Sequence, residues 1–221
     1  MEYSKTDHLL VSQTRILYYQ SITTVSFPVF ACLAICLLLW DVSARSHLIT
    51  WAVIVLLFTL LRYILLWQQR RHKLTPENAG RRLDIFTAGA LFSGLLWGSA
   101  PIILVPYRPD ALLNFTLYNG LTLLIICGLV AGAVISYSVS RWVLIFYAFP
   151  ALVPPAFYLI WLGDVYNTFL GGFVLLYLVF IAVTSYRLNT QYLFYVDLEY
   201  RYKQLQLDHQ KLKEQVARLI R

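Results

Sequence analysis

The stretch 173–221 contains neither glycine nor proline, and this feature constrains the chain more than any other. Because those two residues most often interrupt helices, the stretch can form one continuous helix. Residues 173–183 are apolar on every side, which is typical of a helix surrounded by lipid. Beyond Arg187 the apolar residues are confined to one stripe. The sequence therefore predicts a single helix that begins in a membrane and continues into water.

The stripe beyond Arg187 follows a seven-residue repeat, which is typical of a parallel coiled coil. We call it the seam; leucines fill its d row and mixed residues its a row, namely Leu198, Leu205, Leu212 and Leu219 at d, and Tyr195, Tyr202, His209 and Val216 at a. We expect two copies of the chain to pair along this seam as a homodimer. A lone amphipathic helix lying on the membrane or on another domain is the alternative. The a row lacks Ile and has one Val, so the expected pairing is of intermediate strength, which suits a switch.

The composition is that of an integral membrane protein. Hydrophobic residues make up 59% of the chain and charged residues 13%, with a mean hydropathy of +0.64. The net charge of +7 comes from short basic clusters between apolar runs, which predicts orientation in a bilayer and no binding of nucleic acid. The three cysteines lie inside apolar runs, so we expect packing thiols and neither a disulfide framework nor a metal site.

Six apolar segments approach the roughly 20 residues that a helix needs to cross a bilayer. They are 22–40, 47–67, 84–105, 114–136, 142–162 and 168–186. The sequence predicts an all-α integral membrane fold in three parts. These are an amphipathic N-terminal segment, 1–21, a six-helix transmembrane domain, 22–186, and a coiled-coil helix, 187–221.

Basic residues are distributed unevenly between the two sides of the predicted bundle. Six spans place both termini on one side, and the segments on that side hold 15 of the 18 lysines and arginines. Positive charge accumulates on the cytoplasmic side of membrane proteins, so we expect both termini in the cytoplasm.

Glycines and prolines within the spans are candidates for structural or switch positions. Two glycine pairs have the spacing that lets helices approach closely, Gly94 with Gly98 and Gly128 with Gly132. We expect close packing within the chain, with a subunit interface as the alternative. Pro150, Pro154 and Pro155 predict a bend or local unwinding of the fifth span.

Arg62 is the one basic residue within a predicted span, near its expected cytoplasmic end. We expect an interfacial anchor paired with Asp84, which begins the next span, and a role in an ion or proton path is the alternative. No Asp, Glu, Lys or His occupies the middle of a predicted span. This absence argues against a proton-coupled transporter.

A pocket for a small lipophilic ligand would draw its polar lining from the third and fourth spans. The candidate ligand-binding residues are Trp97, Ser99, Tyr118, Asn119 and Thr122. An amide in lipid needs a partner, although an interhelical hydrogen bond would satisfy Asn119 without a ligand. The spans contain no catalytic constellation and no histidine pair for haem, so we expect no catalytic residues and no cofactor.

Three features together resemble the N-terminal membrane sensor regions of bacterial sensor histidine kinases and diguanylate cyclases. They are Arg81-Arg82-Leu83-Asp84 before a span containing Gly94-Leu95-Leu96-Trp97-Gly98, six spans with short outer loops, and the basic heptad exit helix. The resemblance implies a dimeric input module in the bacterial inner membrane whose exit helix drives a kinase or cyclase.

The catalytic domain itself would follow Arg221. The surroundings of His209 do not match a phosphoacceptor site, the cyclase segment Gly-Gly-Asp-Glu-Phe is absent, and the sequence ends within a heptad. We therefore expect these residues to form the non-enzymatic input half of a longer protein. A small six-helix transporter or channel is the alternative.

Overall fold

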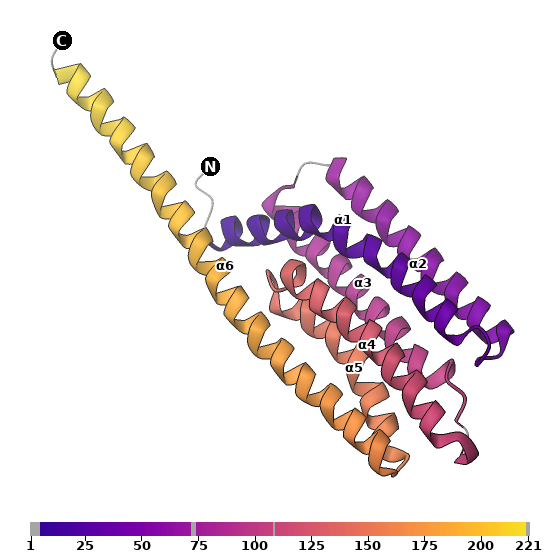
Figure 1. The fold of residues 1–221 in the computed structure, drawn as a ribbon. Helices are drawn as coiled ribbons and strands as arrows, with labels where there is room; N and C mark the ends of the chain where they lie inside the picture. The colour runs from indigo at the N-terminus through magenta and orange to yellow at the C-terminus, as the bar shows by residue number, and fades with distance from the viewer. Residues whose placement is uncertain (1–4, 72–73, 108, 220–221) are drawn as a thin grey trace.

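A computed structural model describes residues 5–71, 74–107 and 109–219, and this part of the chain is helical with no strand (Figure 1). The elements are α1 (Lys5–Leu39), α2 (Arg45–Arg71), α3 (Pro76–Ile103), the 3-10 turn η1 (Pro109–Ala111), α4 (Leu112–Tyr137), α5 (Arg141–Trp161) and α6 (Val165–Leu219). The predicted all-α class is confirmed. The predicted boundary at residue 21 falls inside α1, which is one helix on both sides of it.

The helices are those of a multi-pass membrane protein. Within the described residues, α2 to α6 each contain a stretch long and apolar enough to cross a bilayer. The first predicted span, 22–40, overlaps a shorter apolar stretch, Val25–Leu39, so its crossing stays a prediction. Large apolar side chains cover the outside of the bundle, for example Leu57, which is 61% exposed. Such a surface suits lipid and not water.

The tightest packing is between α3 and α5, and the first glycine pair explains it. A Cβ atom on Gly94 would lie 2.3 Å from the carbonyl oxygen of Tyr147, and one on Gly98 would lie 2.1 Å from that of Pro150. Since no side chain fits at these distances, only glycine lets the two backbones touch. Pro154 has no N–H to offer the Pro150 carbonyl, which is therefore free to lie against Gly98.

One expectation about the spans is wrong, and of the two alternatives for the fifth span, a bend or local unwinding, the unwinding is not observed. The second glycine pair, Gly128 and Gly132, makes no close contact, because no described atom lies within 4 Å of a Cβ built on either residue. Both glycines lie on an exposed face of α4. Local unwinding of the fifth span is also absent, since α5 is helical from Arg141 to Trp161 through its three prolines, Pro150, Pro154 and Pro155.

The last helix, α6, is continuous from Val165 to Leu219 and projects well beyond the other helices (Figure 1). The predicted helix through Arg187 is therefore present, without a hinge. The described seam residues are exposed, including Tyr195 at 69% and Leu205 at 68%. The seam is thus not buried against its own chain. The side chain of Leu219 lies outside the described residues.

Candidate functional site

The point at which α6 leaves the bundle is fixed by buried polar contacts. Asn189, which is 4% exposed, donates its side-chain amide to the carbonyl oxygens of Ser138 at 2.8 Å and Val139 at 3.0 Å. These carbonyls belong to the turn between α4 and α5. One side chain of α6 therefore satisfies two main-chain acceptors that the ends of the other helices leave open.

Arg141, the first residue of α5, completes this group. Its Nε donates to the Asn189 side-chain oxygen at 2.8 Å, and its guanidinium lies 4.7 Å from the centre of the Tyr186 ring. A hydrogen bond between the hydroxyls of Ser138 and Ser185, at 3.2 Å, adds a second link to α6. We call Ser138, Arg141, Ser185 and Asn189 the junction cluster, because these residues join α6 to the α4–α5 turn.

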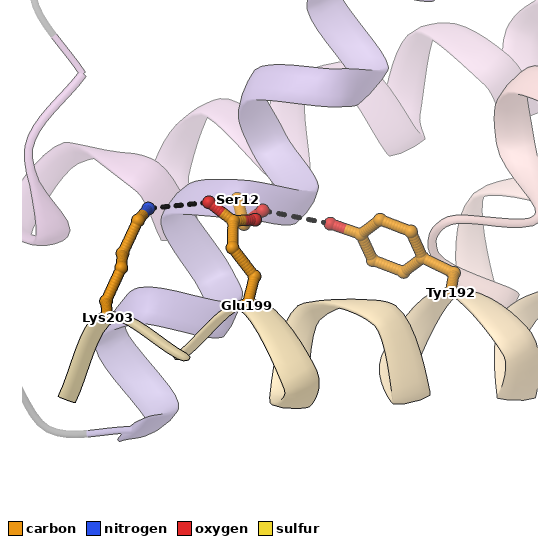
Figure 2. A network of polar contacts seen from close by, with 4 residues as sticks. All are labelled: Ser12, Tyr192, Glu199 and Lys203. Carbon is orange, nitrogen blue, oxygen red and sulfur yellow. Dashed lines mark hydrogen bonds and ion pairs between the residues drawn. The ribbon is translucent and has the colours of Figure 1, made fainter. Parts of the chain in front are cut away.

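The N-terminal part of α1 also contacts α6 and the α4–α5 turn. Figure 2 shows the Tyr192 hydroxyl of α6 donating to the Ser12 hydroxyl, at 3.2 Å, with the ion pair of Glu199 and Lys203 further along α6. Gln13 donates to the carbonyl oxygen of Val139 at 3.3 Å. From Lys5 onward the predicted N-terminal segment is therefore helical and contacts both α6 and the α4–α5 turn.

Tyr192 remains neutral at physiological pH. Burial raises the pKa of its hydroxyl above the ordinary value of 10.0, the hydrogen bond with Ser12 opposes this change, and the Glu199 carboxylate adds to it. The contact with Ser12 is accordingly one between two uncharged hydroxyls.

Arg62 lies inside the bundle and does not pair with Asp84. Its side chain is 9% exposed, and Nη2 donates to the Tyr137 hydroxyl at 3.1 Å. Asp84 is exposed on α3. The expected anchor pair is therefore wrong, and Gly89 helps to explain why: a Cβ there would lie 3.4 Å from Arg62 Nε, so the small residue leaves room for the guanidinium to turn inward.

Aromatic rings take the place of a carboxylate around Arg62. The guanidinium lies 5.4 Å from the centre of the Phe86 ring, and Phe86 packs edge-to-face on Tyr137 at 5.5 Å. Tyr137 in turn packs edge-to-face on Tyr147 at 5.5 Å. The negative faces of aromatic rings attract a cation, which helps to compensate for its removal from water. The guanidinium and these rings therefore link α2, α3, α4 and α5 inside the bundle.

The five predicted ligand-binding residues do not surround one cavity. Trp97 is 1% exposed and packs on Trp51 of α2, with ring centres 5.5 Å apart. The Ser99 hydroxyl donates to the carbonyl of Leu96 in its own helix. Tyr118 borders a small cavity with Asp41 and Asn114. Trp97 therefore packs against α2, whereas Tyr118 lies at a different cavity, and the predicted ligand pocket stays a prediction.

Asn119 and Thr122 do lie together, one turn apart on the interior face of α4. Both are fully buried. The Asn119 amide nitrogen donates to the Phe115 carbonyl at 3.3 Å, whereas its oxygen and the Thr122 hydroxyl have no hydrogen-bond partner among the described residues. No described cavity opens onto them. A ligand-binding role for these two residues stays a prediction.

A groove between α1 and α4 has a volume of about 760 Å³. We call it the α1–α4 groove. It is lined by Phe27, Phe30, Ala31, Ile125, Gly128, Leu129, Gly132, Ile135, Ser136 and Tyr147. The second glycine pair creates this space, because neither glycine has a side chain to fill it. The sequence carried this signal, but glycines at this spacing also mark helix contacts, so the groove was not predicted.

Metal or thiol chemistry finds no support in the described residues. No group of three His, Cys, Asp or Glu side chains comes together there, and Cys32, Cys36 and Cys127 are free thiols.

Comparisons with protein-family models, curated proteins and solved structures give no match to this chain.

Proposed function

We propose that this chain is the membrane-embedded input module of a bacterial signal-transduction protein, a sensor histidine kinase or diguanylate cyclase. In this proposal the module is a homodimer in the inner membrane with both termini in the cytoplasm. An intramembrane or lipophilic stimulus changes helix packing, and α6 transmits the change to a catalytic domain beyond residue 221.

The observation that carries the proposal is the continuity of α6 together with its exposed seam. A helix that leaves its bundle with leucines and tyrosines exposed along one stripe is stabilised when a second copy covers them. The absence of a hinge at Arg187 means that a rotation or shift of the apolar part also moves the seam.

A contiguous set of contacts connects the α1–α4 groove to α6. Tyr147 lines the groove and packs on Tyr137. Tyr137 is the last residue of α4, directly before the turn whose carbonyls bind Asn189. An occupant that displaces Tyr147 therefore acts on the two helices that hold α6. The volume of the groove is within the range of small-molecule sites, about 300 to 1,000 Å³.

Filling the groove tests the proposal without a known stimulus. The readout is the rate of disulfide crosslinking of Leu205→Cys in native membranes, in a protein whose natural cysteines are replaced by alanine. Gly132→Leu places a side chain in the groove and is expected to change this rate. Gly172→Leu is the matched control, because that glycine is equally open but lies outside the groove.

Two results would count against the module. An unchanged rate in Gly132→Leu would separate the groove from the seam and remove the proposed route. The same change in both variants would show a general effect of added bulk. Solute flux through liposomes containing the purified chain would instead favour a transporter or channel.

A further inference from the structure

A second groove runs between α5 and α6 and ends at Arg141. Its volume is about 300 Å³, and its walls are apolar, with Leu144 and Ala148 on α5 and Leu178 and Ala182 on α6. We call it the α5–α6 groove. Arg141 and Tyr186 lie at the end next to the junction cluster. The site therefore joins a long apolar surface to one cation.

Arg141 has donors available for an anion. Among the described residues its one hydrogen bond is from Nε to Asn189, and no carboxylate pairs with it. The side chain is exposed. A guanidinium carries five N–H donors in a planar arrangement that matches phosphate and carboxylate groups, so four remain.

A second copy of the chain would not cover this groove. Tyr186, at the groove, and Tyr195, in the seam, are nine residues apart, which is about two and a half helical turns. The two side chains therefore lie on opposite sides of α6. In a dimer paired along the seam the α5–α6 groove still faces the bilayer, and lipid is the molecule that meets it.

We infer that the α5–α6 groove binds an anionic phospholipid, with an acyl chain along Leu144, Ala148 and Leu178 and the phosphate at Arg141. The inference rests on the proposed function, whose orientation places Arg141 at the cytoplasmic surface, where anionic lipids are enriched. The positive charge of Arg141 favours an anionic head group, and the apolar walls of the groove favour an acyl chain.

Lipid bound in this way would regulate α6 through Asn189. The guanidinium that would bind the phosphate also donates from Nε to the Asn189 oxygen. Because the charged acceptor makes the stronger hydrogen bond, a guanidinium drawn toward the lipid gives up this Nε contact. When Arg141 turns to the lipid, Asn189 loses one of its three hydrogen-bond partners and keeps the carbonyl oxygens of Ser138 and Val139. Occupancy of the groove therefore loosens the contact that sets the position of α6.

Photo-labelling of the whole chain in nanodiscs tests the inference. The probes are phosphatidylglycerol and phosphatidylcholine that carry the same photoactivatable acyl chain, each added as a trace to phosphatidylcholine nanodiscs. Labelled peptides are mapped by mass spectrometry. We expect phosphatidylglycerol to label 144–149 and 178–186 about fivefold more than phosphatidylcholine, the preference that one cation near a membrane surface provides. Labelling around Leu57 on α2 is the internal reference for both lipids.

Variants separate the head-group contact from the chain contact. Arg141→Ala should remove the preference for phosphatidylglycerol and Arg141→Lys should keep most of it. Arg187→Ala, which removes an exposed cation outside the groove, should change nothing. Ala182→Phe fills the groove and should reduce labelling by both lipids, even though Arg141 is intact.

The inference is overturned by equal labelling with the two lipids, or by a preference that survives Arg141→Ala. Loss of the preference in excess inorganic phosphate would also overturn it, since that result identifies a site for a free anion. Failure here is distinguishable from failure of the proposed function. The lipid preference does not require the seam, and crosslinking along the seam does not require the lipid.

Discussion

The side-chain amide of Asn189 donates a hydrogen bond of 2.8 Å to the main-chain carbonyl oxygen of Ser138, across the boundary between α6 and the α4–α5 turn. Both residues are buried. A buried amide is held in place strongly because each broken hydrogen bond leaves a group without a partner. The position of α6 is therefore tied to the α4–α5 turn at this residue.

Asn189→Ala is expected to lower the free energy of unfolding by about 1 to 3 kcal/mol, because it removes the side-chain donor of the buried Ser138 carbonyl oxygen. The measurement is denaturant unfolding of the purified protein in detergent. Thr190→Ala is the control, since Thr190 is exposed and its hydroxyl donates only to Tyr186 in the same helix. Similar losses in the two variants would show that Asn189 does not hold α6.

Tyr137→Phe should lower the free energy of unfolding by about 1.5 to 3 kcal/mol, because it removes the hydrogen-bond acceptor of the buried Arg62 guanidinium. The double variant Arg62→Met with Tyr137→Phe should cost less than Tyr137→Phe alone, since no unpaired charge then remains. Unfolding in detergent measures both, with Tyr166→Phe as the control at a position 63% exposed. Strictly additive losses would contradict a direct interaction between Arg62 and Tyr137.

Replacing a closely packed glycine and an open glycine by alanine should have opposite effects on the free energy of unfolding. Gly98→Ala places a Cβ 2.1 Å from the Pro150 carbonyl oxygen, so α3 and α5 must separate, and we expect a loss of about 1 to 3 kcal/mol or more. Gly132→Ala meets no described atom within 4 Å and should stabilise α4 by about 0.5 to 1 kcal/mol. Thermal unfolding of the two variants gives the comparison. Equal destabilisation would mean that α3 and α5 are not in close contact.

The contact between Tyr192 and Ser12 predicts a stability change only in alkali. Because burial raises the pKa of Tyr192 above 10.0, the folded form binds its proton more tightly than the unfolded form. This contribution to stability is complete below pH 10 and declines as the pH rises through the raised pKa. Thermal unfolding at pH 7 to 11 measures it as a difference between wild type and Tyr192→Phe. If the stability difference between wild type and Tyr192→Phe already changed between pH 7 and 9, the pKa of Tyr192 would not be raised, contrary to this account.

Periodicity and composition are enough to predict the helical class and the course of α6. The absence of glycine and proline after residue 172 predicts an uninterrupted helix, and the leucine repeat predicts an apolar stripe along one face of it. The contact at Gly94 and Gly98 follows from the same kind of local reasoning. Such features depend on residues close together in the chain, which is why sequence alone reveals them.

The junction cluster and the partner of Arg62 depend on contacts that no local pattern encodes. Asn189 is 51 residues from Ser138 in the sequence, and Arg62 bonds to Tyr137, 75 residues away, although Asp84 is nearer to it in the sequence. Glycines at helical spacing are ambiguous for another reason. The same pair permits a close contact when a helix faces it, as at Gly98, and creates a groove when none does, as at Gly132.

The central claim is that two subunits share α6 as one stiff element, and disulfide crosslinking along the seam tests it most directly. Single cysteines at Leu198, Leu205 and Leu212 are compared in native membranes with one at Gln210, which is exposed but off the seam. We predict a symmetric crosslinked dimer at all three leucines and little at Gln210. No dimer at any of the three, or equal crosslinking at Gln210, would contradict a paired α6.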